Sequence, residues 1–243
     1  MKPQVTRRLI RLNAAFYQTF AAEFAESRAA IQPGIRRALA EIANCRSILD
    51  IGCGDGRVAQ ALAKMGWAGR YIGVDFSERL IELARARELT SLRATFIKAD
   101  ISRRDWTGQL PRQSFDAALA FAVFHHIPGA RRRIRLMRQI ISRLKPGGLA
   151  VVSTWQFLSD ERLKRKIAPW SRIGLTSSDV EEADYLLDWK RGGEGLRYVC
   201  ALGETELREL ARAAGCEVLE MWRADGRTGE LSLYTVLRVE EGE

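Results

Sequence analysis

The sequence predicts an α/β fold in which helices cover both faces of a mostly parallel sheet of seven strands. Apolar runs with strand character alternate with amphipathic helical segments between residues 46 and 155, and such alternation is typical of parallel sheets. The run Phe115–Ala122 is almost wholly apolar, as expected of a strand that is buried on both faces. Two late strands flank Asp225-Gly226, a turn dipeptide that favours a hairpin and therefore an antiparallel last strand.

The elements follow from their residue patterns in chain order. Two helices are expected over residues 8–45, because apolar residues recur at helical spacing on both sides of a break at Pro33-Gly34. Ser77 is a favourable N-cap for a helix that runs to Glu88. A helix over Arg131–Arg143 is closed by the Pro-Gly-Gly sequence at 146–148. The other core elements are the strands Ser47–Ile51, Tyr71–Val74, Ala94–Ala99 and Leu149–Thr154 and the helix Arg57–Met65.

We expect residues 1–243 to form one domain with four parts. Residues 1–45 would supply N-terminal helices over the site, and residues 46–155 the core that binds the ligand. Residues 156–200 have an irregular pattern and are interpreted as an inserted cap. Residues 201–243 contain a late helix, Thr205–Ala214, and a closing hairpin of Cys216–Arg223 and Leu231–Val239.

Composition limits the classes of protein. The formal net charge of +9 and the pI of about 9.8 fit an acidic partner such as nucleic acid, or an arginine-rich composition without functional bias. No apolar run approaches the ~18–20 residues of a membrane span, and arginines interrupt the basic N-terminus, so we expect no secretory signal. The cysteines form no C-x-x-C pair, and the histidines are only His125 and His126. We therefore expect reduced thiols, no metal site and a cytoplasmic location.

Three glycines follow the first core strand at every second position. In SILDIGCGDGR, residues 47–57, they are Gly52, Gly54 and Gly56. Glycines directly behind a strand let a ligand contact the backbone at the carboxyl end of the sheet. The dinucleotide spacing G-x-G-x-x-G is absent, and Asp50 would repel a pyrophosphate but suits a cationic amine. The motif therefore favours a ligand without phosphates.

Carboxylates also end the next two strands, at Asp75 and Asp100. Two carboxylates at adjacent strand ends suit a bidentate hold on a ribose diol, because a charged acceptor makes stronger hydrogen bonds than a neutral one. Two alternatives stay open. Asp75 could instead be a helix N-cap or a solvated strand end, and Asp55 could be a solvated turn residue.

Taken together, these motifs resemble the class I S-adenosylmethionine-dependent methyltransferases, which have a Rossmann-like fold. LDIGCGDG, YIGVDFS and FIKADI are similar to their first three motifs, and FDAALAFAVFHHI with LKPGGLAVVS to the next two, over about residues 45–155. The resemblance implies S-adenosyl-L-methionine as the cofactor, with Asp75 on the ribose hydroxyls, Asp100 on the adenine amine and Ile101 over the ring. The cofactor-binding residues that it implies are Asp50, Gly52, Gly54, Gly56, Asp75, Phe76, Asp100, Ile101 and Phe121.

A more specific resemblance is to the tRNA wobble-uridine carboxymethyl methyltransferases. NAAFYQTFAAEFAESR, STWQF, APW and RYVCALGETELRELARAAGCEV are similar to segments of that family. The resemblance implies esterification of carboxymethyluridine, tRNA as a partner and a small zinc-binding activator subunit. The chain departs from the family's Y-Y-H-L-Y pattern at residues 198–202, so no histidine role is carried over there.

Two other functions stay open. The first is a small-molecule O- or N-methyltransferase. The second is a cofactor-binding scaffold without turnover, against which the intact Asp50, Asp75 and Asp100 argue. The sequence indicates no membrane partner, and it does not indicate an oligomeric state.

The candidate catalytic residues depend on the acceptor. A carboxylate is ionised at pH 7, so it needs a cation to place it and no base. Arg28 is the candidate cation, with Tyr17 and His125 or His126 lining the site. A phenol or amine would need a base, for which the histidine pair is suited. The alternative for the pair is one packed and one exposed imidazole. Trp155 could stack on a splayed base or pack in the core.

A basic segment lies between Gly129 and Gly147 and contains no acidic residue. We expect a buried stripe of apolar residues on this helix, so that most of its arginines face solvent. Such a face could contact RNA phosphates, or it could be an ordinary solvated face. The expected stripe is Ile134, Met137, Ile141 and Leu144, and the cations are Arg131, Arg132, Arg133, Arg135, Arg138, Arg143 and Lys145.

Overall fold

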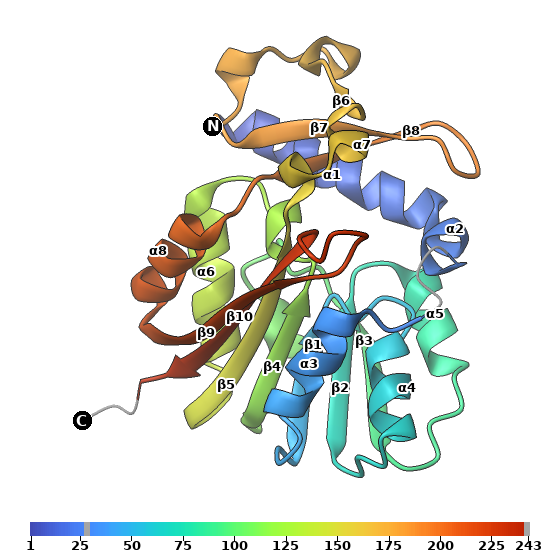
Figure 1. Cartoon of the computed structure of the whole chain (residues 1–243), viewed down its shortest axis with the longest axis vertical. Coiled ribbons are helices and arrows are strands. Elements are labelled where there is room, and N and C mark those ends of the chain that lie inside the picture. The colour runs from blue at the N-terminus through green and yellow to red at the C-terminus, as the bar shows by residue number, and fades with distance from the viewer. Residues whose placement is uncertain (27–29, 241–243) are drawn as a thin grey trace.

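A single seven-stranded sheet forms the centre of the computed structural model, which describes residues 1–26 and 30–240 (Figure 1). Its strands are β1 (Ser47–Ile51), β2 (Arg70–Asp75), β3 (Arg93–Lys98), β4 (Phe115–Phe121), β5 (Leu144–Trp155), β9 (Cys216–Ala224) and β10 (Ser232–Val239). The strand order is β3-β2-β1-β4-β5-β10-β9. Strands β1 to β5 are parallel, and β10 is antiparallel to both of its neighbours. The predicted fold class is therefore confirmed.

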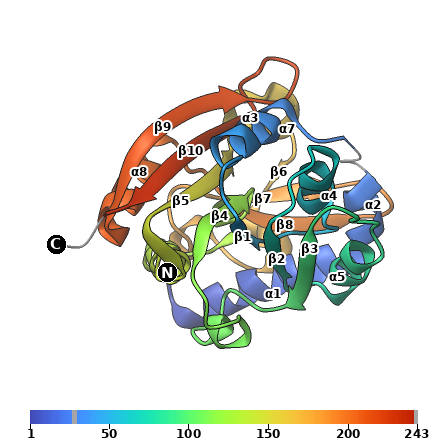
Figure 2. The same ribbon diagram turned by 90° about the horizontal axis from the view of Figure 1, so that it is seen from below.

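Helices cover both faces of this sheet (Figures 1 and 2). On one face, α3 (Pro33–Glu41), α4 (Arg57–Lys64) and α5 (Glu78–Arg85) share an apolar core with the strands. On the other face, α6 (Ala130–Ile141) and α8 (Glu204–Ala214) pack over a second core. The sheet is therefore buried on both faces, and a ligand can reach its strands only at their ends.

A small antiparallel sheet lies over the carboxyl ends of the main strands (Figure 1). It consists of β6 (Ile167–Ala168), β7 (Asp184–Trp189) and β8 (Gly195–Cys200), in that order. A single turn of helix, α7 (Glu161–Lys164), precedes it. Helix α1 (Pro3–Thr19) packs along β8, and α2 (Ala21–Glu26) continues from it. No helix in the described part of the chain is both long and apolar enough to cross a bilayer.

Two helical predictions need correction. The N-terminal segment forms three helices instead of two, and the second break falls between α1 and α2. The helix that begins at Ser77 ends at Arg85, three residues before Glu88. Just beyond the helix end, the guanidinium of Arg87 binds the backbone oxygen and the carboxylate of Asp55. The predicted N-cap is confirmed, since the Ser77 hydroxyl accepts the Leu80 N–H at 3.4 Å.

The basic segment also differs from its prediction. Helix α6 ends at Ile141, and β5 starts at Leu144, so the Pro-Gly-Gly sequence is a bulge inside a strand. The helix lies with Arg133, Leu136, Met137 and Ile140 buried, while Ile134 and Ile141 are only half-buried. Met137 and Leu144 of the expected stripe are buried, and its other two residues pack against the core while partly exposed.

Several of the basic side chains bind backbone oxygens. Arg133 donates to the Ile127 carbonyl at 3.0 Å and pairs with Glu181 at 3.3 Å. Arg138 donates to the Ala213 carbonyl at 2.7 Å, and Arg143 to the Gln113 carbonyl at 3.1 Å. These arginines stabilise the tertiary structure, so only part of the segment is free to face a partner.

Candidate active site

A cavity of about 300 Å³ opens at the carboxyl ends of β1 to β4, and helix α1 lines it from above. Each strand end contributes its following turn, so residues far apart in the sequence meet at one edge of the sheet. The lining includes Asn13, Tyr17, Gly52, Gly54, Arg57, Asp75, Phe76, Asp100, Ile101, Ser102, Phe121, Ala122, Val123 and His126. Its volume lies in the ordinary range for a small-molecule site.

The glycine turn brings backbone to the floor of this cavity. Gly52 has φ +70°, and a Cβ there would lie 2.7 Å from a methyl carbon of Val123. A side chain at this position would therefore be strained and would clash. Gly56 does not line the cavity; a Cβ there would lie 2.9 Å from that of Ala84, so this glycine permits α4 and α5 to pack closely.

Asp75 lies at the end of β2 with its carboxylate held by two backbone donors. It accepts the Gly54 N–H at 3.1 Å and the Ser77 N–H at 2.9 Å. Burial raises the pKa of Asp75 to about 6, although these hydrogen bonds lower it in part. Ser77 is the N-cap of α5, so Asp75 is neither the cap nor a solvated strand end. Asp100, at the end of β3, is exposed and accepts the Ser102 N–H at 2.9 Å.

Asp50 lies outside the main cavity, in a smaller cavity beside it. Its side chain is 2% exposed and accepts a hydrogen bond from the Tyr71 hydroxyl. Burial raises the pKa of Asp50 to about 7, and the bond from Tyr71 opposes this shift. The two cavities share Gly52, Arg57, Phe121 and Ala122, so they meet at the glycine turn.

A chain of hydrogen bonds joins α1 to the cap at the roof of the main cavity. The Tyr17 hydroxyl lies 2.6 Å from Nε2 of His126, and Nδ1 of His126 lies 3.1 Å from the Tyr198 carbonyl oxygen. A carbonyl oxygen only accepts, so Nδ1 must carry the proton, and in the neutral ring Nε2 then accepts from Tyr17. His126 is therefore held as the tautomer whose Nε2 lone pair accepts the hydrogen bond of the Tyr17 phenol.

His125 lies apart from this chain. Its ring is 1% exposed, stacks on Trp155 at 6.0 Å between ring centres, and its Nδ1 accepts the Trp155 N–H at 3.3 Å. His125 is therefore the packed imidazole of the histidine pair, while His126 lines the cavity. Arg28 lies outside the described residues. Asp55 is buried and paired with Arg87, which corrects its reading as a solvated turn residue.

Three residues at the site were missed in the sequence. Asn13 bonds both backbone groups of Tyr198, accepting its N–H at 2.7 Å and donating to its carbonyl at 3.0 Å. The sequence feature that could have identified Asn13 is a polar residue on the apolar face of α1. Arg57 directly follows the glycine turn and lines both cavities. Arg197 lies in the cap, where the sequence pattern gives no strand signal.

The described residues show no metal centre. Among residues 1–26 and 30–240, no three His, Cys, Asp or Glu side chains gather closely enough to hold an ion. The cavity instead offers a backbone cradle, a buried carboxylate on a neighbouring strand end and apolar walls from Phe76, Ile101 and Phe121. This donor set fits a nucleoside.

The chain belongs to the methyltransferase domain family, whose model matches residues 18–221. It is an S-adenosylmethionine-dependent methyltransferase of class I. Its fold is similar to that of DhpI in a solved complex with S-adenosylmethionine, with a TM-score of 0.65, 20% identity and coverage of 95% of this chain and 97% of that one. It is also similar, with a TM-score of 0.61, 18% identity and coverage of 93% and 97%, to a chain of the complex between the Haloferax volcanii Trm112 methyltransferase activator and a candidate methyltransferase.

Curated relatives of similar sequence are named or marked as methyltransferases. A protein of Encephalitozoon cuniculi whose name marks it as a candidate methyltransferase is 30% identical over 91% of this chain and 92% of its own length. The tRNA (carboxymethyluridine(34)-5-O)-methyltransferase ALKBH8 of Mus musculus is 27% identical over 67% of this chain. The match spans 23% of that relative's length, and 34% of the bovine probable tRNA methyltransferase 9B.

Because the carboxyl of Asp50 is buried, we expect the free energy of unfolding to depend on pH. Its pKa is about 7 in the folded protein and 3.8 ordinarily, so the folded state holds the proton more tightly. The stability that this contributes is present below about pH 4 and is lost as the pH rises through about 7. The loss is on the order of 4 kcal/mol. Asp50→Asn removes this titration, so the free energy of unfolding of the variant should gain on that of the wild type as the pH rises.

Urea denaturation of both proteins from about pH 5 to about pH 8 measures this difference. A constant offset between the two proteins across that range would contradict the assigned titration.

Proposed function

We propose that this protein methylates tRNA, esterifying the carboxymethyl group of a wobble uridine. Sequence relatives named for that reaction support the substrate class, at 26–29% identity over 57–67% of this chain. The structural observation that favours an RNA partner is a group of arginines beside the cofactor cavity. A tRNA substrate would also fit the expected cytoplasmic location.

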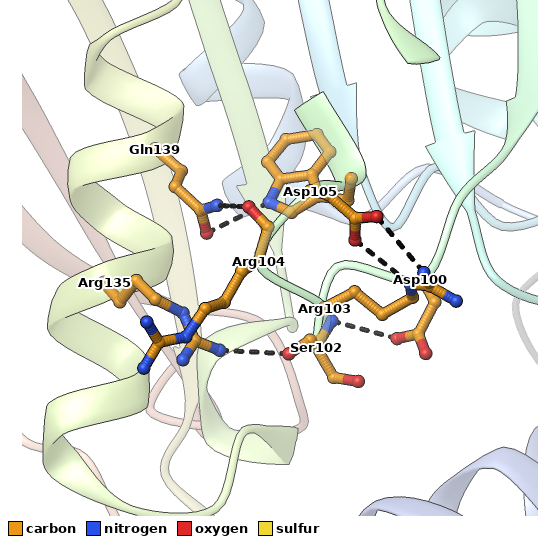
Figure 3. A network of polar contacts seen from close by, with 8 residues as sticks. Asp100, Ser102, Arg103, Arg104, Asp105, Arg135 and Gln139 are labelled. Carbon is orange, nitrogen blue, oxygen red and sulfur yellow. Dashed lines mark hydrogen bonds and ion pairs between the residues drawn. The ribbon is translucent and has the colours of Figure 1, made fainter. Parts of the chain in front are cut away.

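The arginine rim, as we name Arg104, Arg132 and Arg135, lies next to the wall of the cavity. Arg135 donates to the Ser102 carbonyl at 3.0 Å, and Ser102 lines the cavity. Figure 3 shows the Arg104 and Arg135 side chains next to each other. Burial, and then repulsion by Arg132 and Arg104, lowers the pKa of Arg135. Cations that repel one another are stabilised by an anion, and a phosphate of a nucleic acid backbone is such an anion.

The neighbouring Arg103 differs from the rim. Its guanidinium makes two hydrogen bonds of 3.1 Å with the Asp105 carboxylate, so its charge is balanced locally (Figure 3). Arg132 and Arg135 of the rim lie in the N-terminal half of α6, and Arg104 lies in the segment after β3. Arg143 and Lys145 instead bind groups at the opposite end of the sheet. The free cations of the segment and the mouth of the cavity are therefore on the same side, as RNA binding requires.

Within this proposal, the residues that hold the cofactor are those at the strand ends. Asp75 would bind the ribose hydroxyls, Asp100 the adenine amine, and Ile101 would cover the ring, with Phe76 and Phe121 as apolar walls. Bound S-adenosylmethionine supplies a methyl group that its sulfonium already activates. The acceptor carboxylate forms the new O–C bond as the C–S bond breaks, the electron pair leaves with sulfur, and no proton moves. Holding the reactants in line can be worth roughly 7–11 kcal/mol.

A small-molecule acceptor is the second candidate. The hydrogen bonds from Tyr17 to His126 and from His126 to Tyr198 favour it, because they would prepare a base that a carboxylate does not need. Under either reaction we propose that residues 1–243 work as one methyltransferase domain, with α1 and the cap closing the site.

We also propose a small zinc-binding activator subunit as a partner, since a fold neighbour was solved in a complex with the Trm112 activator.

The test of this function is methyl transfer from labelled S-adenosylmethionine to bulk tRNA from a strain that lacks the gene. We expect label in tRNA that mild alkali releases, because a methyl ester hydrolyses under conditions that leave N- and C-methyl groups intact. The assay is run with and without a zinc-binding activator. Label absent from tRNA in both cases, together with tight cofactor binding, would contradict the proposal and favour the small-molecule acceptor.

The arginine rim predicts a specific change in the salt dependence of tRNA binding. Removing two cations with Arg104→Ser and Arg132→Ser should lower the slope of log K against log[salt] by about 1–2, since each phosphate contact contributes about 0.7–0.9. The matched control is Arg93→Ser with Arg112→Ser, which removes the same charge from two exposed positions, the first residue of β3 and the loop before β4, at the amino ends of the strands. Equal slopes for the two double variants would exclude the rim as a phosphate contact.

A further inference from the structure

Arg197 is a buried cation in strand β8 of the cap. Its side chain is 4% exposed, and its guanidinium carbon lies 4.5 Å from the ring centre of Trp155, 5.4 Å from that of Phe16 and 5.5 Å from that of Trp189. The rings form apolar walls around the guanidinium. Cation–π contacts offset only part of the cost of removing this charge from water.

No carboxylate balances this charge within the described ranges 1–26 and 30–240. Burial lowers the pKa of Arg197, and among the described residues the Tyr17 hydroxyl opposes the shift, through a charge interaction and a hydrogen bond. The Nε–H group is buried without a hydrogen-bond partner. Buried charges in proteins are normally paired, so a cation with an unused donor indicates an anion that arrives from outside.

Arg197 lines neither cavity, but two of the residues that it contacts do. Its partner Tyr17 lines the main cavity, where it also bonds His126. The Trp155 ring, on which its guanidinium lies, lines the smaller cavity. The cavities meet at Gly52 and Ala122. Arg197 therefore lies directly behind Tyr17 and Trp155, and an anion would reach it from the cavities between these two side chains.

We propose that Arg197 binds a carboxylate at the junction of the two cavities and so positions the reacting groups. The carboxylate could belong to the carboxymethyl group of the acceptor, and in that case the inference rests on the proposed function. It could instead be the carboxylate of the methionine part of S-adenosylmethionine. In either case the planar guanidinium, fixed between aromatic walls, offers a preformed fork for two parallel hydrogen bonds.

The two sources predict different kinetic signatures for Arg197→Gln. If the acceptor is bound, the variant should lose about 100-fold in kcat/KM for tRNA, while its Kd for S-adenosylhomocysteine changes less than about twofold. If the methionine carboxylate is bound, the Kd for S-adenosylhomocysteine should rise at least about tenfold, and the loss should vanish for a decarboxylated cofactor analogue. Arg197→Lys keeps the charge without the fork, so a loss of about tenfold in the same parameter is expected.

Arg191→Gln is the matched control, because Arg191 is exposed in the loop between β7 and β8. Melting temperatures separate a folding defect from a binding defect, and the lysine variant decides the question if the glutamine variant does not fold. Folded Arg197→Lys and Arg197→Gln proteins with unchanged Kd and kcat/KM would overturn the inference. Wild-type protein that does not label tRNA would instead contradict the proposed function, and the cofactor arm would still test Arg197.

Discussion

The carboxylate of Asp75 is the point on which the site depends. It accepts backbone N–H groups from Gly54 in the turn after β1 and from Ser77 in the turn after β2. These bonds fix two neighbouring turns relative to each other, and the glycine turn can approach closely only because Gly52 has no side chain. The carboxylate is buried against its preference for water, which raises its pKa to about 6. Its environment is therefore arranged for a ligand that donates hydrogen bonds.

The roof of the site is built from helix α1 and the cap, neither of which is part of the seven-stranded sheet. Asn13 of α1 bonds the backbone of Tyr198 in β8, and Tyr17 of the same helix bonds His126. Helix and cap are thus joined at the cavity by directed hydrogen bonds, so an acceptor must enter past them. In this arrangement α1 and the cap determine which acceptor can enter, while the strand ends of the sheet form the part of the site that would bind the cofactor.

The sheet and the glycine turn could be predicted because their signals are local: apolar runs, turn residues and strand-end carboxylates. The cap sheet could not, since β6 has two residues and pairs only with a strand about twenty positions away. Side-chain partners were also out of reach. Arg133 and Arg138 looked like solvent-facing cations but bind carbonyl oxygens, and Arg197 looked like any other arginine. Such choices depend on tertiary neighbours, which spacing does not encode.

The most direct test of the account is the affinity for S-adenosylhomocysteine as a function of pH. If the ionised Asp75 carboxylate holds the ribose hydroxyls, the Kd should be constant above its pKa of about 6 and should rise about tenfold for each pH unit below it. Asp75→Asn should bind weakly and show no such rise, and Asp50→Asn, which removes the neighbouring titration, should keep it. A Kd that stays constant from about pH 5 to about pH 8 in the wild type would contradict the central role of Asp75.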